Sequence, residues 1–214
     1  MKAIIISLAL SLSLLTVSGA SQAALISEDG GQLIYDTALN ITWLADANLA
    51  ATNTFSVSGV LLPNGYMTWA TAQSWIGAMN TADYLGYSDW RLPTSDTTCS
   101  GNNCTGSEMG QLFYTELGGV TGTDIATTHN ANLALFQNVH SDDYWSGTEY
   151  VPNSFAWNFA FSNGSQGVNT EDSNLYAWAV RPGDVAVVPL PPAVWLFGSG
   201  LLGLIAIARR KKTA

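Results

Sequence analysis

The sequence predicts one α+β domain of antiparallel strands and two helices, placed between two terminal segments that resemble export signals. Short runs of alternating polarity, separated by turn residues, indicate antiparallel strands. Two longer stretches carry an apolar face at helical spacing. Residues 1–23 and 188–214 are largely apolar, and they hold five of the seven lysines and arginines of the chain.

Residues 1–23 have the parts of a secretory signal peptide. A basic start is followed by an apolar run over 3–17, and small residues stand at positions −3 and −1 of a cleavage site after Ala23. We therefore expect cleavage between Ala23 and Ala24, and a mature domain over 24–187.

The C-terminal segment, residues 188–214, has a proline motif, an apolar run and a cationic end. Prolines prevent a helix from extending backward. The uncharged run over 193–208 is a little shorter than the ~20 residues that span a bilayer, and the four cations at 209–212 favour the cytoplasmic side. We expect a transmembrane helix here before processing. The motif that opens the segment contains Val188, Pro189 and Pro191.

The first half of the domain predicts a hairpin, a loop and a helix. Residues 31–36 alternate in polarity, and 41–44 return after a turn, which indicates a β-hairpin. Residues 51–66 are small and polar and predict a loop. From Trp69 onward, apolar residues recur at i, i+3, i+7 and i+10, which predicts a helix over 68–85.

The second half begins with a helix over 107–119, which Gly118 and Gly119 are expected to end. Residues 120–140 predict irregular structure, and 162–167 predict a turn with an Asn-Gly signal. Three further strands are expected over 143–150, 154–161 and 175–180. Alternate residues of the second strand form an all-aromatic face, which is more typical of a core than of a binding surface. That face comprises Phe155, Trp157, Phe159 and Phe161.

The domain is strongly acidic. Arg91 and Arg181 are its only cations against all sixteen acidic residues, which leaves a formal charge of −14 over 24–187. Such a surface repels nucleic acid, anionic lipid and sulfated polysaccharide. We expect each guanidinium to bond carboxylates or carbonyls where the ends of the domain meet. An anion pocket lined by the two arginines is the alternative.

Cys99 and Cys104 are the only cysteines. An exported protein meets an oxidising compartment, which favours a disulfide between them. Neither His129 nor His140 stands at a spacing typical of zinc ligands.

The sequence contains no motif typical of an enzyme: no Gly-x-Ser-x-Gly, no phosphate-binding glycine loop and no His-Glu-x-x-His. A glycosidase pair drawn from Asp142, Asp143 and Glu149 stays open as an alternative. No cofactor is expected. The oxygen-rich segments 141–143 and 169–174 leave calcium open as a ligand, beside the simpler interpretation of two solvated turns.

Three stretches, 33–48, 68–94 and 144–182, resemble the Lcl C-terminal domain family, through "DWRLPT", "YWSGTEY" and "VRP" in that order. Their motif order is also similar to that of domains with a C-type-lectin-like fold. The resemblance implies a small twisted antiparallel sheet with two flanking helices. The chain departs from the family pattern in an insertion over 95–106.

The last segment, "VPLPPAVWLFGSGLLGLIAIARRKK", resembles the PEP-CTERM sorting tails in their VPLPA variant. This resemblance implies a Gram-negative exporter, secretion machinery, and an exosortase-type processing enzyme at the inner membrane. It also implies a link to extracellular polysaccharide. The protein would then be anchored transiently in the inner membrane before it reaches the cell surface or the extracellular matrix.

Taken together, these features predict an exported, non-catalytic domain that binds carbohydrate or another matrix component. A self-assembling structural protein of the matrix is the alternative. We expect a binding site on loops and strand ends of the C-terminal half. The alternative is that Trp145 belongs to the core and that the other candidates are solvated. The candidates are Tyr144, Trp145, Glu149, Asn158, Asn163, Gln166, Glu171, Asp172 and Asn174.

Overall fold

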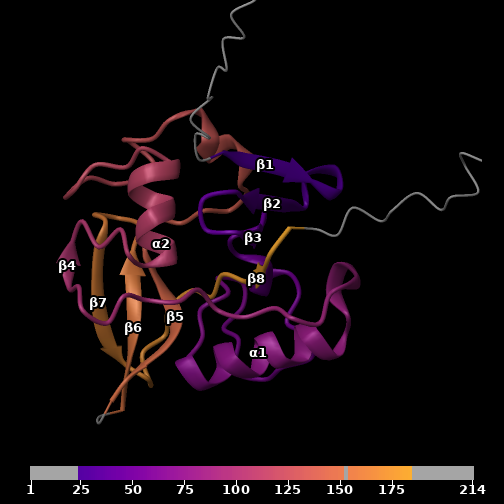
Figure 1. Ribbon diagram of the computed structural model, residues 1–214. Helices are drawn as coiled ribbons and strands as arrows, with labels where there is room; N and C mark the ends of the chain where they lie inside the picture. Colours follow the sequence, from indigo (N-terminus) through magenta and orange to yellow (C-terminus); the bar gives the residue numbers. More distant parts are fainter. Residues whose placement is uncertain (1–23, 152–153, 185–214) are drawn as a thin grey trace, which may run out of the picture.

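Two four-stranded antiparallel sheets and a few helices make up residues 24–151 and 154–184, the part of the chain that the computed structural model describes (Figure 1). The α+β class is confirmed, but two sheets replace the single sheet that was expected. The expected signal peptide, proline motif and transmembrane helix lie outside the described residues. No helix within the described ranges is long and apolar enough to cross a membrane.

The first sheet has the strand order β1-β2-β3-β8. The β2–β3 hairpin matches the prediction, and Leu33 pairs with Leu44. Asp36 forms its turn, because Oδ1 accepts hydrogen bonds from the backbone N–H groups of Ala38 and Leu39 at 3.0 and 3.1 Å. The strands are β1 (Leu25–Glu28), β2 (Leu33–Asp36), β3 (Ile41–Leu44) and β8 (Val180–Pro182).

The second sheet has the order β4-β7-β6-β5. A register shift separates Trp145 from Glu149 on β5. The expected turn over 162–167 was too long, because the chain reverses sooner and Gln166 already pairs with Phe159. The strands are β4 (Gly101–Asn102), β5 (Asp143–Tyr150), β6 (Phe155–Ala160) and β7 (Ser165–Thr170).

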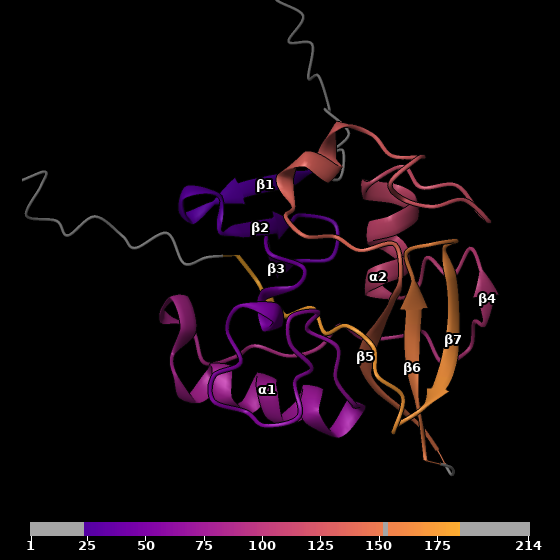
Figure 2. The same ribbon diagram turned by 180° about the vertical axis from the view of Figure 1, so that it is seen from behind.

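The strand expected over 175–180 is mostly absent. Leu175 and Tyr176 form only isolated bridges, to Met67 and Tyr144, and regular pairing begins at Val180. The physical reason is that this segment leaves the second sheet beside β5 and crosses to the first sheet, as Figure 2 shows. It therefore pairs with each sheet at only one end.

Two helices accompany the sheets. In α1 (Trp69–Thr81) the side chain of the N-cap Thr68 accepts a hydrogen bond from Thr71 N–H. The helix ends four residues before the predicted end at 85. It buries Ala72, Ile76 and Met79 of the predicted apolar face, while Trp69 is only partly buried. The second helix is shorter than expected, because α2 (Glu108–Gln111) continues into a π-helix, η4 (Leu112–Glu116). The 3-10 turns are η1 (Asp29–Gly31), η2 (Leu49–Ala51), η3 (Tyr84–Gly86) and η5 (Ala131–Leu135).

Aromatic side chains join the two sheets. Trp178, on the crossing segment, is fully buried, and its ring lies 5.1 Å from Trp43 of β3 and 5.7 Å from Tyr144 of β5. Its Nε1 donates to Leu44 O at 2.7 Å, so the buried indole N–H is satisfied. Phe159 and Phe161, from the aromatic face predicted to be core, are also fully buried.

Candidate functional site

The insertion over 95–106 is fixed to the second sheet. The predicted disulfide between Cys99 and Cys104 is present, and β4, inside the bridged loop, pairs with β7. The buried side chain of Gln166 donates through Nε2 to Asp96 O at 2.8 Å and to Cys99 O at 2.6 Å. The disulfide and these bonds hold the loop in one place beside the hairpin of β5 and β6.

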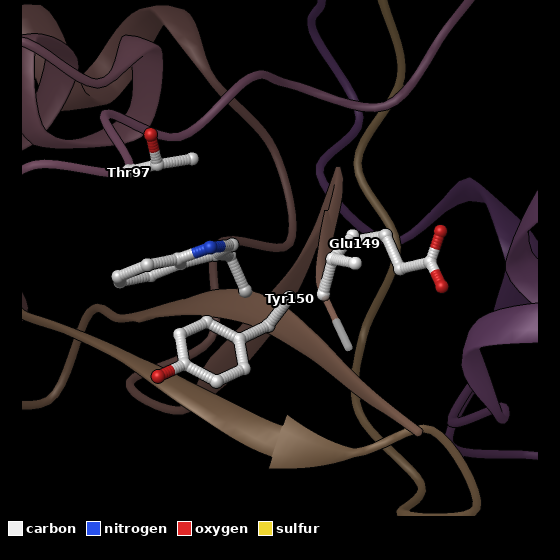
Figure 3. Close-up of a pocket in the computed structure, with 5 residues that line it drawn as sticks. Thr97, Glu149 and Tyr150 are labelled. Atoms are coloured by element: carbon white, nitrogen blue, oxygen red, sulfur yellow. The ribbon is translucent and has the colours of Figure 1, made fainter. Parts of the chain in front are cut away.

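A surface hollow of about 320 Å³ lies between this loop and the hairpin (Figure 3). Thr97 comes from the fixed loop, between Asp96 and the disulfide, and the other lining residues come from β5, β6 and the chain between them. We call this feature the aromatic hollow. Its lining residues are Thr97, Glu149, Tyr150, Val151 and Trp157.

Two aromatic rings form the main surface of the aromatic hollow. Tyr150 pairs with Phe155 across the hairpin, which places Tyr150 diagonally opposite Trp157 on the same face. The two ring centroids lie 5.6 Å apart at an interplanar angle of 70°, a favourable edge-to-face arrangement. Tyr150 is 40% exposed and Trp157 only 5%. The buried indole therefore supports a tyrosine ring that is open to solvent.

The polar groups of the aromatic hollow are mainly hydroxyls. Figure 3 shows the Glu149 carboxylate directed away from Thr97 and from the Tyr150 ring. This is expected, because consecutive residues of a strand point to opposite faces. The hollow thus offers an aromatic surface with the hydroxyls of Thr97 and Tyr150 at its edge.

Several predicted site residues are buried and cannot contact a ligand from solution. Tyr144 and Trp145 are fully buried, so they belong to the core; Trp145 Nε1 donates to Met67 O at 2.8 Å. Asn158 is buried within β6. Gln166 is buried as well, and it anchors the inserted loop instead of facing solvent.

The remaining predicted residues do not line the aromatic hollow. Asn163 Oδ1 accepts a hydrogen bond from Ser165 N–H in the turn before β7. Glu171, Asp172 and Asn174 follow β7 at the surface, and none of them lines the aromatic hollow. Of the nine predicted residues, Glu149 alone is part of its lining.

Sequence reasoning missed four of the five lining residues. Thr97 carried no signal, because nothing local shows that an inserted loop returns to the sheet. Tyr150 was overlooked as the last residue of a predicted strand. Trp157 was assigned to the core, which agrees with its low exposure but hides its contact with Tyr150.

Each arginine forms an ion pair with a carboxylate. Arg91 makes two hydrogen bonds to Glu108, at 2.6 and 2.7 Å. Arg181 makes two to Asp89, at 2.9 and 3.2 Å, and its guanidinium lies 4.0 Å from the centre of the Tyr87 ring. Neither guanidinium in the described part of the chain is left unpaired to bind an anion.

Asp143 and Glu149 lie too far apart on β5 to serve as a glycosidase pair. Across the bulge of β5, Asp143 pairs with Ala160 and Glu149 with Ala156, which are four residues apart on β6, or about 13 Å at 3.3 Å per residue; glycosidase pairs lie within ~10 Å. Asp142 accepts a hydrogen bond from Tyr66 Oη at 2.6 Å. Burial, and then the charge of Asp142, raise the pKa of Asp143. Within 24–151 and 154–184 no three His, Cys, Asp or Glu side chains are grouped to hold a metal ion.

Two comparisons with known proteins bear on the chain. A family model described as the Lcl C-terminal domain matches residues 32–181, which is more than half of the sequence. No curated protein matches it.

Proposed function

Because the chain belongs to the Lcl C-terminal domain family, we propose that it is an exported, non-catalytic protein that binds carbohydrate through the aromatic hollow. One observation carries this proposal. The exposed ring of Tyr150 is held edge-to-face on Trp157 in an open hollow of about 320 Å³.

The chemistry of the aromatic hollow suits a sugar ring. A pyranose has an apolar face of C–H groups and a rim of hydroxyls, and it can stack on an aromatic ring while its rim forms hydrogen bonds. Thr97 and Tyr150 supply hydroxyls beside the ring surface. The volume is at the lower end of the ~300–1,000 Å³ typical of ligand sites, which favours a short stretch of a glycan.

Charge favours a neutral glycan over a sulfated one. The segment 24–187 carries a formal charge of −14, and both of its guanidinium groups are paired with carboxylates. An anionic polysaccharide would therefore meet repulsion with no free cation to offset it.

We propose that the terminal segments determine where the protein acts. Residues 1–23 would direct export, and 188–214 would serve as a PEP-CTERM-type signal for an exosortase-type enzyme at the inner membrane. The destination would be the cell surface or extracellular matrix of a Gram-negative bacterium. We further propose that the fold is C-type-lectin-like, and its two antiparallel sheets with few helices are compatible with that fold.

The test compares the parent with Tyr150→Ala on an array of neutral and sulfated glycans, using the full chain in detergent micelles. Ile26→Ala is the matched control, because Ile26 is 45% exposed but lies on β1 of the other sheet. We expect neutral glycans to bind, Tyr150→Ala to weaken them about tenfold, as expected for a lost contact of ~1.4 kcal/mol, and Ile26→Ala to leave them unchanged.

Two results would contradict the proposal. Binding that persists in Tyr150→Ala would place the site elsewhere. A protein that binds no glycan but assembles with itself as its concentration rises would instead be a structural component of the matrix.

A further inference from the structure

A second pocket lies on the first sheet, apart from the aromatic hollow. Its volume is about 160 Å³. We call it the polar pocket, because four of its lining residues carry hydrogen-bonding side chains. These are Gln32, Asp46, Tyr84 and Gln137, and Leu44 and Leu49 add apolar contacts.

The backbone of the polar pocket is held by hydrogen bonds across the chain. Ala45 N–H donates to Gln32 O at 2.9 Å, and Ala45 O accepts from Gln137 N–H at 2.7 Å. Ala47 N–H donates to Gln137 O at 2.9 Å. The residues around Asp46 are therefore clamped between two distant segments, so the pocket is formed before any ligand arrives.

Asp46 has one oxygen that is available to a ligand. Its Oδ1 already accepts from Asn48 N–H and Asn138 Nδ2, both at 2.9 Å. Oδ2 has no hydrogen-bond partner among residues 24–151 and 154–184. The bonds at Oδ1 fix the carboxylate, and Oδ2 remains a positioned acceptor.

Tyr84 supplies a hydrogen-bond donor, its phenol O–H, beside the acceptor Asp46 Oδ2. Burial, and then the charge of Asp46, raise the pKa of Tyr84, so the phenol keeps its proton. Its Oη also lacks a partner within the described residues. Its ring packs edge-on against Phe55 at 5.3 Å, and Asp83 and Leu85 on either side adopt φ of 47° and 56°. Such left-handed residues persist where the surrounding structure demands them, often at ligand sites.

We propose that the polar pocket binds a single neutral sugar residue through adjacent hydroxyl groups. A sugar hydroxyl both donates and accepts, and the pocket offers a carboxylate oxygen, a phenol and two amides to match a pair of them. Its volume of about 160 Å³ is roughly half the ~300 Å³ at the lower end of ligand sites, so the pocket would take part of a single sugar ring and not a longer glycan. A metal ion would find one carboxylate with a single free oxygen, and an anion would find no cation.

The experiment titrates the full chain in detergent micelles with the methyl glycosides of glucose, galactose, mannose and N-acetylglucosamine. Binding is followed by two-dimensional 1H–15N NMR. We expect at least one glycoside to shift the amide signals of Asp46, Tyr84 and Gln137. The methyl glycoside of glucuronate should bind at least tenfold more weakly than the neutral glycoside that binds best, because its carboxylate meets that of Asp46.

Two variants and two matched controls locate the site. Tyr84→Phe removes only the phenol oxygen, and Gln137→Ala removes the exposed amide while keeping the backbone bonds. Each should weaken binding about fivefold, the effect of one lost hydrogen bond. Tyr35→Phe and Gln73→Ala make the same chemical changes outside the pocket and should leave binding unchanged.

The proposal fails if no glycoside shifts those three amides, or if Tyr84→Phe and Gln137→Ala both bind as the parent does. It also fails if the shifts disappear in Tyr150→Ala, because the ligand would then occupy the aromatic hollow. The two sites can therefore be refuted separately.

Discussion

Replacing Arg181 with alanine should destabilise the domain by about 2–3 kcal/mol. The side chain is 10% exposed and the side chain of its partner Asp89 45% exposed. Asp89 would be rehydrated after the change, so the loss falls below the ~3–5 kcal/mol of a buried unpaired charge. It exceeds the ≤1 kcal/mol of a surface pair, because the guanidinium also donates to Asp184 O at 3.1 Å and lies over the Tyr87 ring. The contact with the ring alone contributes ~0.5–1 kcal/mol.

Urea unfolding and calorimetry measure the effect. A loss of this size should lower Tm by about 5–10 °C in a domain of this length. Arg181→Lys should recover only part of it, because lysine lacks the planar fork that bonds both oxygens of Asp89. A double-mutant cycle with Asp89→Ala isolates the pair. If Arg181→Ala melted like the parent and instead lost its glycan, the guanidinium would serve a ligand and the reasoning here would be refuted.

Three further predictions concern other parts of the domain. Burial raises the pKa of Asp36 above its usual 3.8. The contribution of the protonated Asp36 carboxyl to stability is therefore complete below pH 3.8 and is lost as pH rises through the raised pKa. The urea midpoint should fall as pH rises over this range, and Asp36→Asn should flatten that fall. Cys99→Ser with Cys104→Ser should cost ~2 kcal/mol by calorimetry and, by releasing the inserted loop, should weaken glycan binding on the array; unchanged binding would show that the loop does not matter. Gly164→Ala should cost about 3 kcal/mol in urea unfolding, because Gly164 has φ of 76° and a Cβ there would collide with Tyr114 Oη; a soluble variant of parental stability would contradict this.

Local periodicity predicted the elements whose contacts are close in the sequence. The β2–β3 hairpin and α1 were predicted in this way, because Asp36 starts the hairpin turn and Thr68 caps the helix. β7 was missed because its residues are polar and include Gly167. Its pairing with β6 stabilises it, and that pairing depends on tertiary structure. The number of sheets depends on where the crossing segment around Trp178 lies, which no local pattern reveals.

The candidate sites depend even more on distant contacts. The aromatic hollow needs Thr97 and Tyr150, which are far apart in the chain and line it together because the disulfide, the β4–β7 pairing and Gln166 fix the inserted loop. The polar pocket likewise brings Tyr84 and Gln137 to Asp46. Residue types alone suggested the acidic and amide side chains that follow β7, and these line neither the aromatic hollow nor the polar pocket.

The short strand β8 determines how the domain bears mechanical load. It is the outer strand of the first sheet, and any pull transmitted along the chain beyond Asp184 reaches it first. The bond from Arg181 Nη1 to Asp184 O at 3.1 Å would be loaded first. The bonds from Gly183 N–H to Asn40 O at 2.8 Å and from Thr42 Oγ1 to Gly183 O at 2.7 Å would follow. At the middle residue of β8, the two hydrogen bonds from Arg181 to Asp89 hold the strand to the rest of the domain. The Arg181–Asp89 pair would therefore resist detachment of β8. The domain should unfold at a higher force than the backbone hydrogen bonds of a three-residue strand alone would sustain.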